Sequence, residues 1–466
     1  MIAVALRNLR HRPGGFAATF LSAFLGATLL MAFGALFDTA AGADAGSGES
    51  LTTTASVGGG WCLVIVAFAV TSTLSLAVRQ RADQVALLRR IGATGPQLRR
   101  MIVGEAALVA MVASAAAVPA GLALGRVLVG LLRNTGQVAE TVHSAFGPIA
   151  LGAGFGVTLL GSVAAGIATA RRTTAPPSIR RSSAPPDTRR TSAPPDTRRT
   201  STPAGTLPRR PRARRIAAAL FLLAGANCAA LTATLMDGKG IDAMQTAGQA
   251  GIWAAIGLAL LAPELLRLVT PALGPLVRLI GGAPGELAVL GVHTRVRELA
   301  GAVMPVLLFT GITTGTVYMQ GIEDKAAAGQ VQPDYAQDVQ TLNYVVVGMI
   351  TLFVAIMLIN TLIAATAGRR REFAQHRLAG ATRGQLTAMV AMEGLLVTVT
   401  GVLGGTVAAM FTVLPFASAR ADRLWPDATP AAYTIVVAVA VLLATATTIG
   451  TTRRTIRGPA TAAVRA

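Results

Sequence analysis

The sequence contains few of the residues that build metal and redox sites. Its 466 residues include only two cysteines, Cys62 and Cys228, and four histidines. Both cysteines lie in apolar runs, so they provide neither a disulfide framework nor a thiolate cluster. The histidines are scattered, with no second ligand at the spacing that a metal ion requires. We therefore expect no metal site in this chain.

Lysine is equally scarce, since Lys239 and Lys325 are the chain's two lysines. A P-loop needs the lysine of G-x-x-x-x-G-K-[ST], and neither lysine stands in that frame. The chain also lacks a G-x-S-x-G elbow, paired catalytic carboxylates and an H-E-x-x-H helix. We predict that the chain is not an enzyme and uses no cofactor of its own.

Charged residues make up only 13% of the chain, whereas 53% of its residues are hydrophobic. This composition excludes a soluble protein of this length. A transmembrane helix needs about 20 apolar residues, and ten such runs are centred near residues 27, 68, 113, 158, 225, 260, 310, 354, 402 and 441. We therefore predict an all-α polytopic membrane protein with about ten transmembrane helices.

The net charge of +20 is distributed unevenly along the chain. With the N-terminus inside, only six of the 41 basic residues fall on the outer side: Arg126, Arg133, Lys239, Lys325, Arg420 and Arg423. This asymmetry obeys the positive-inside rule and places both termini in the cytoplasm. The remaining arginines would face the anionic inner leaflet of the lipid bilayer. No aromatic-interleaved basic patch accompanies them, so we expect no nucleic-acid binding.

The chain contains an internal duplication with an offset of 288 residues. The stretch RADQVALLRRIGATGPQLRRMIVGEAAL at 81–108 returns as RRREFAQHRLAGATRGQLTAMVAMEGLL at 369–396. Six predicted spans separate the two copies, and this number is even. The two halves should therefore run in the same direction through the membrane, as parallel repeats.

Each copy of the duplicated stretch predicts a helix, an elbow and a second helix. Gly92 and Gly380 stand where a helix C-cap needs a residue that tolerates the left-handed conformation. The motif Thr-x-x-Gln follows at 94–97 and 382–385 and fits a capping box, which starts a new helix. Each elbow should therefore be a rigid cytoplasmic joint between two membrane helices.

The chain resembles the FtsX-like permeases of ABC transporters in one sequence pattern, which lies between two spans. The pattern is a basic run, an acidic or amide residue and then R-x-x-G-A-T-x-x-Q-L. In that family the segment is the coupling helix, which docks on a separate ATPase that binds ATP and Mg²⁺. The second copy is closer to the family pattern, since the first has Asp83-Gln84 in place of Arg371-Glu372. The resemblance assigns ATPase coupling to Arg81, Gln84, Arg89, Arg90, Gly92, Ala93, Thr94, Gln97, Arg369, Glu372, Arg377, Gly380, Ala381, Thr382 and Gln385.

The predicted organisation is two four-span repeats that flank a two-span insert. Residues 1–172 form the first FtsX-like repeat, 173–214 a disordered linker, 215–285 the insert and 286–466 the second repeat. The linker consists of nonapeptide units such as RRTSAPPDT, whose paired prolines and repeated arginines oppose folding. The 4+2+4 arrangement resembles the bacitracin-type permeases, but the predicted external loops at 38–57 and 321–341 are too short to hold their large extracellular domain.

Three polar features lie outside this pattern. Asn360 falls within the eighth span, where an amide can join helices. Glu264 and Arg267 are spaced to pair on one helix face at the inner membrane edge. The segment 287–297 corresponds to the first residues of the chain, and we expect both segments to lie along the inner interface.

The resemblance implies the permease subunit of an ABC transporter in a bacterial plasma membrane, with one ATPase copy beneath each elbow. The expected substrate is a hydrophobic or amphipathic compound such as an antibiotic, a peptide or a lipid, which is exported or extracted. One alternative is mechanotransmission, in which ATP-driven movement controls an external partner such as a cell-wall hydrolase. A secondary transporter is the other alternative, although the spans show few of the intramembrane charges that it would need.

Overall fold

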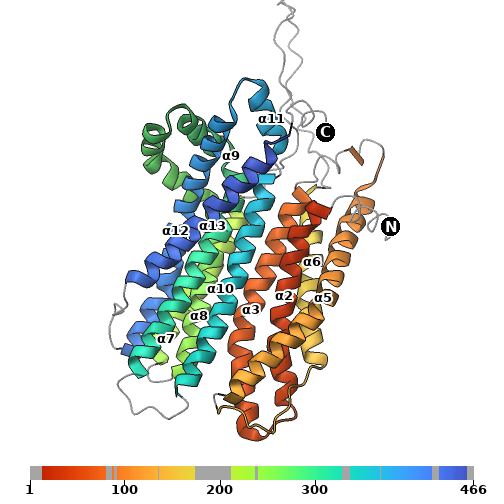
Figure 1. Cartoon of the computed structure of the whole chain (residues 1–466), viewed down its shortest axis with the longest axis vertical. Coiled ribbons are helices and arrows are strands. Elements are labelled where there is room, and N and C mark those ends of the chain that lie inside the picture. The colour runs from red at the N-terminus through yellow and green to blue at the C-terminus, as the bar shows by residue number, and fades with distance from the viewer. Residues whose placement is uncertain are drawn as a thin grey trace, which may run out of the picture.

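The computed structural model is a bundle of long helices, and its described residues contain no strand (Figure 1). The residues that it describes are 13–79, 87–88, 92–134, 136–173, 211–236, 240–327, 336–367, 369–421 and 430–458. The proposed linker lies outside them between 174 and 210, while its last four residues belong to a helix. That helix begins at Pro211, as expected for a residue that suits the first turn.

The first half of the chain forms four helices that stand side by side in Figure 1. They are α2 (Pro13–Ala40), α3 (Ala45–Arg79), α5 (Gly95–Asn134) and α6 (Pro148–Thr173). The helix α2 is central, because it packs against the other three. Pro119 lies inside α5 without ending it.

The remaining chain forms the insert and the second half of the bundle. Its helices are α7 (Pro211–Leu235), α8 (Gly240–Leu260), α9 (Ala262–Ala327), α10 (Ala336–Ala367), α11 (Arg370–Leu378), α12 (Arg383–Ala421) and α13 (Pro430–Thr455). Here α9 takes the place of α2 and packs against α10, α12 and α13. The same pairs of helices therefore meet in both halves, as expected of parallel repeats.

The long helix α9 is interrupted twice. Gly282 has φ 54° and Arg295 has φ −120° with ψ 25°, so neither residue is helical. The part 283–294 folds back on the part 262–281, and Arg278 pairs with Glu286 across the turn at 3.0 Å between Nε and Oε2. We name residues 262–294 the inner hairpin. Only the part 296–327 rises through the second half of the bundle.

Within the described ranges, nine helices are long and apolar enough to cross a membrane. The helix α8 is not among them by composition, and it carries Asp242, Gln245 and Gln249. It nevertheless runs in the bundle against α7, α9 and α12. With α8 the structure accounts for the predicted number of about ten.

Three predicted boundaries are wrong, and one of them is the loop at 321–341, whose two ends belong to α9 and α10. Residues 45–57 are not an external loop but the first turns of α3. Asp44 Oδ2 accepts the Ser47 N–H at 3.2 Å, and Leu51 is fully buried. The predicted sixth span at 251–269 is instead α8, which begins at Gly240 and ends at Leu260. Apolarity alone does not mark this end, which comes just before Pro263.

The expected pairing of Glu264 with Arg267 is also wrong. Glu264 forms ion pairs with Arg214 and with Arg215, whose Nε atom lies 3.4 Å away, both at the start of α7. Arg267 is exposed. Helical spacing predicted a partner on the same helix, but the neighbouring helix of the insert brings two arginines to the carboxylate.

The two halves of the bundle are joined by a polar contact. Asn360 on α10 donates a hydrogen bond from Nδ2 to Ser22 Oγ on α2 at 3.1 Å. Asn360 is only 7% exposed, which confirms the prediction of a buried polar residue that joins helices. The main apolar core also draws residues from both halves, including Phe33, Trp61, Leu307 and Phe416.

Candidate functional site

The second elbow consists of α11, a turn and the start of α12. Gly380 has φ 100°, in the left-handed region that favours glycine, as the sequence predicted. The N–H of Gly380 donates to the Arg377 carbonyl at 3.1 Å, and the N–H of Ala381 donates to the His376 carbonyl at 3.0 Å. This pair of bonds is a Schellman motif, which satisfies the last carbonyls of α11.

A reciprocal capping box then starts α12. The N–H of Thr382 donates to Gln385 Oε1 at 3.0 Å, and the N–H of Gln385 donates to Thr382 Oγ1 at 3.2 Å. Two donors that the first helical turn would leave unpaired are thereby satisfied. The turn between α11 and α12 is fixed by backbone and side-chain bonds alike.

The first elbow repeats this geometry where the structure describes it. Gly92 has φ 96°, and the N–H of Ala93 donates to the Leu88 carbonyl at 3.0 Å. The N–H of Thr94 donates to Gln97 Oε1 at 3.0 Å. The other four residues assigned to this elbow, which are Arg81, Gln84, Arg89 and Arg90, lie outside the described residues.

Both elbows lie at the same end of the bundle. In Figure 1 this is the upper end, where α5 begins and where α11 is labelled. The exposed tip of the second elbow carries Leu378, which is 56% exposed, together with Arg383. Gln97 is exposed on the first elbow. A partner on that side of the bundle can therefore reach both tips.

An ionic network holds the second elbow to its surroundings. Arg369 binds Glu372 through two hydrogen bonds of 3.0 and 3.2 Å, and its Nη1 atom lies 2.5 Å from Glu393 Oε2 on α12. Glu372 also pairs with Arg295, at the break in α9. Three elements thus meet at one cluster of charges, which we name the elbow network: Arg295, Arg369, Glu372 and Glu393.

The elbow network shifts the pKa of its own members. Burial alone would raise the pKa of the Glu372 carboxyl, but the hydrogen bonds and charges of Arg369 and Arg295 outweigh burial and hold this pKa below its usual value. Burial lowers the pKa of Arg369, but Glu372 and Glu393 raise it further. Both groups therefore stay charged at neutral pH.

An apolar cluster packs beside the elbow network. Phe373 on α11 is 1% exposed and packs with Ala288 of the inner hairpin, Leu386 and Met389 of α12, and Ile456 after α13. The Arg369 guanidinium lies over the Phe373 ring, 5.0 Å from its centroid. The second elbow therefore cannot move without α9, α12 and the end of α13.

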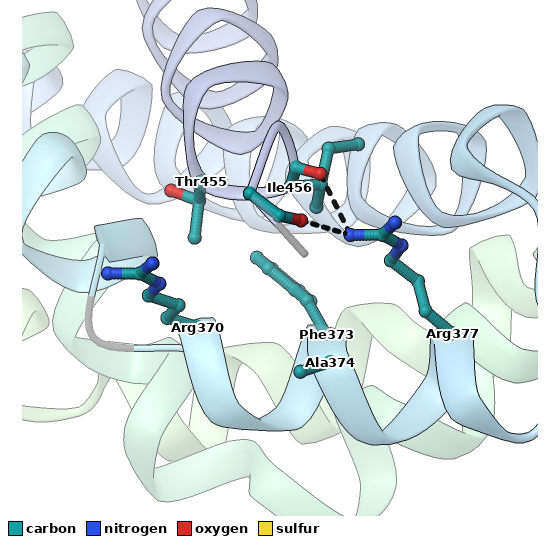
Figure 2. Close-up of a pocket in the computed structure, with 7 residues that line it drawn as sticks. Arg370, Phe373, Ala374, Arg377, Thr455 and Ile456 are labelled. Carbon is teal, nitrogen blue, oxygen red and sulfur yellow. Dashed lines mark hydrogen bonds between the residues drawn. The ribbon is translucent and has the colours of Figure 1, made fainter. Parts of the chain in front are cut away.

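The side chain of Arg377 binds residues of the same chain that follow α13. Its Nη1 atom donates to the carbonyls of Ile456 at 3.0 Å and Gly458 at 2.7 Å (Figure 2). Figure 2 shows Phe373 between Arg370 and Arg377, directed toward the end of α13. The crevice there measures about 10 Å³, which is room for no more than one water molecule. Arg377 positions α11 against α13, a role that the sequence did not suggest.

Sequence reasoning missed Arg295, Phe373 and Glu393. One signal was available for Glu393, since it and Glu105 match in the duplicated stretch within otherwise apolar surroundings. Glu105 is likewise buried, at 8% exposed. Among the described residues, no group of three metal-binding side chains comes together.

Comparison with known families identifies the repeated unit. The family model described as FtsX-like permease C-terminal matches residues 56–177 and 344–460, together about half of the chain. The two matches begin 288 residues apart, which equals the offset between the elbows, and each contains one elbow. Comparison with curated proteins gives no match. The chain belongs to the FtsX-like permease family, whose unit it carries twice.

Proposed function

We propose that this permease subunit of an ABC transporter exports or extracts a hydrophobic or amphipathic compound, such as an antibiotic, a peptide or a lipid. FtsX-like permeases are multi-pass membrane proteins that work with separate ABC ATPases. In this proposal two ATPase copies bind one chain, one beneath each elbow. The membrane is a bacterial plasma membrane, and both termini are cytoplasmic.

The observation that carries the proposal is the pair of matching elbows at one end of the bundle. Each elbow leads into a long helix, α5 or α12, through a glycine with positive φ and a capped helix start. A rigid joint transmits a rigid-body movement without absorbing it. Closure of two ATPase copies would then move α5 in one half and α12 in the other.

Glu372, Arg369 and Arg377 act in this proposal by positioning the second elbow rather than by touching the ATPase. All three side chains already have partners inside the chain. In this proposal the exposed tip contacts the ATPase, and this tip includes Leu378, Thr382 and Arg383. The first elbow would use its exposed counterparts, including Thr94 and Gln97.

The short connections between helices at the described outer end favour transport over control of a large external partner. The connection between α2 and α3 spans only residues 41–44. Asp38 accepts hydrogen bonds from the N–H groups of Gly147 at 2.9 Å and Ala150 at 2.8 Å, which ties the connection before α6 to α2. These short, bonded connections leave little surface for a hydrolase.

The test is reconstitution of the permease with its ATPase in lipid nanodiscs. Arg383→Glu and Leu378→Asp change the exposed tip without touching a buried contact. We expect both variants to insert normally, to lose ATPase association and to lose substrate-stimulated hydrolysis. Leu352→Asn, at an exposed position on α10 within the bundle, is the control and should keep association. Wild-type association in both tip variants would remove the second elbow from the docking surface.

A further inference from the structure

The first helix of the inner hairpin presents an exposed apolar stripe. Leu268 is 74% exposed and Leu279 is 83% exposed, and Leu276 lies between them. The spacing of these residues, 8 and 11 positions after Leu268, places them on one face of a helix. Ile280 extends the stripe at the turn of the hairpin. A face of this kind is stable only against another apolar phase.

The opposite face of this helix belongs to the bundle. Leu266 and Val277 are 0% and 3% exposed and are part of the main core, together with Val289 and Val292 from the second helix of the hairpin. The apolar interior of the transmembrane bundle thus continues into the inner hairpin. Two faces of one helix are apolar, one of them covered by protein and the other open.

The position of the hairpin along α12 indicates whether the stripe contacts lipid or water. Near its first residue the hairpin contacts α12 through Leu265 and Gly404, and at its turn through Gly281 and Met392. At about 1.5 Å per residue, Gly404 lies about 32 Å from the start of α12 and Met392 about 14 Å from it. The helix α12 has 39 residues and a length of about 58 Å. A hydrocarbon core of about 30 Å that ends near Arg420 on the outer side has its inner boundary about 25 Å from the start of α12.

The inner hairpin therefore straddles the inner boundary of the bilayer. Its first residues agree with this level, because Glu264 binds Arg214 and Arg215 at the start of α7, where basic residues mark the inner membrane edge. The exposed tip of the second elbow, at the start of α12, lies about 14 Å farther into the cytoplasm than Gly281 at the turn of the hairpin. An ATPase bound at the elbow would leave the stripe uncovered.

We propose that the inner hairpin is a monotopic anchor whose leucine stripe is immersed in the phospholipids of the inner leaflet. Leu268 contacts acyl chains, and Leu276 and Leu279 lie nearer the headgroups. Arg267 and Arg278 are exposed on one flank, 11 residues apart, and reach the phosphate groups of the lipids, Arg278 while its Nε atom stays paired with Glu286. This helix enters the interface at an angle, because its two ends lie about 18 Å apart along α12, and it does not cross the membrane.

The anchor is connected to the second elbow. Arg295 follows the hairpin and pairs with Glu372 on α11, and Gly291 packs so closely against the Glu393 carboxylate that a Cβ at 291 would require this carboxylate to move. Ala288 packs with Phe373 in the elbow's apolar cluster. The hairpin thus holds the second elbow at a fixed depth below the membrane.

Spin labelling of the full chain in nanodiscs tests this proposal. Single cysteines replace Leu268, Leu279, Leu220 and Gln375 in a chain that carries Cys62→Ala and Cys228→Ala, and each receives a nitroxide. Leu220, exposed on α7 within the bundle, reports the bilayer, and Gln375, exposed on α11, reports water. Collision with oxygen reports lipid, whereas collision with a water-soluble nickel chelate reports solvent.

We expect the label at 268 to collide with oxygen and to exclude nickel, as at 220, and the label at 279, nearer the headgroups, to be several-fold less accessible to nickel than the label at 375. Nickel accessibility equal to that at 375 would place the stripe in water and overturn the proposal. Exclusion of both reagents would show that protein covers the stripe, and would overturn it too. In the double variant Arg267→Gln/Arg278→Gln, the preference of phosphatidylglycerol over phosphatidylcholine near a label at 279 should fall by up to about fivefold per arginine at low salt. An unchanged preference would remove the arginines from lipid contact.

Discussion

The Nη1 atom of Arg369 lies 2.5 Å from Oε2 of Glu393, whose side chain is only 2% exposed. This contact joins the residue before α11 to the third turn of α12, on either side of the elbow. A buried carboxylate is stable only with a bonded cation beside it. The angle between α11 and α12 is therefore fixed by charge as well as by the turn.

Removal of the cation should destabilise the elbow strongly. Arg369→Gln leaves Glu393 buried without its cation, and breaking such a pair costs about 3–5 kcal/mol. We expect a clear drop in the thermal unfolding midpoint of the purified permease. The double variant Arg369→Gln/Glu393→Gln should recover part of the loss, because no unpaired charge remains. An equal loss in both variants would show that the ion pair is not the cause.

The backbone of the elbow can be tested separately from its contacts. Nothing lies within 4 Å of a Cβ added at Gly380 or Gly92, so a substitution there meets only the strain of positive φ. Gly380→Val should cost about 1–2 kcal/mol and reduce substrate-stimulated ATP hydrolysis more than basal hydrolysis. Gly92→Val should be milder, because the first copy departs from the family pattern. Gly384→Ala, whose Cβ makes only an ordinary contact, is the control and should behave as wild type.

Acid should loosen the second elbow in a defined pH range. The pKa of Glu372 in the folded chain lies below its usual 4.5. A lowered carboxyl pKa provides stability that is complete above pH 4.5 and is lost as the pH falls through the folded-state value. The unfolding midpoint should therefore fall as the pH drops below about 4.5. Glu372→Gln should reduce this dependence, and an identical pH profile would contradict it.

The contact between α9 and α12 depends on small residues. A Cβ added at Gly405 would lie 2.8 Å from the Leu307 carbonyl oxygen and 2.9 Å from the Gly311 nitrogen, both backbone atoms of α9. Glycine at such a crossing lets two membrane helices approach closely. Gly405→Leu should force the helices apart and prevent recovery of a monodisperse protein. Gly450→Leu on α13, where nothing lies within 4 Å, should be tolerated.

The local features of the elbows followed from the sequence. The positive φ values of Gly92 and Gly380 and the bonds of the Thr-x-x-Gln motifs involve residues at most five positions apart. Such short-range geometry is set by the residues themselves, through the lack of a Cβ in glycine and the reach of a glutamine side chain. The duplication then required that both copies have the same geometry.

The partners of the charged residues did not follow from the sequence. Arg377 bonds to carbonyls 79 and 81 positions away, and Glu264 pairs with arginines of the preceding helix. Helical spacing proposes partners three or four positions away, but the folded bundle supplies closer ones. The interface placement expected for 287–297 stays a prediction, and the start of the hairpin's first helix was assigned to a transmembrane span that ended near 269.

Site-specific photo-crosslinking in intact membranes tests the central claim most directly. A photoreactive amino acid at Gln97 or at Arg383 probes the two elbow tips, and one at Tyr344, exposed beside Asp324 near the outer end of α9, is the control. We predict a crosslink to the ATPase from both elbow positions and none from 344. Absence of an ATPase crosslink from both elbows, in a chain that copurifies with the ATPase, would contradict the claim that the elbows are its docking sites.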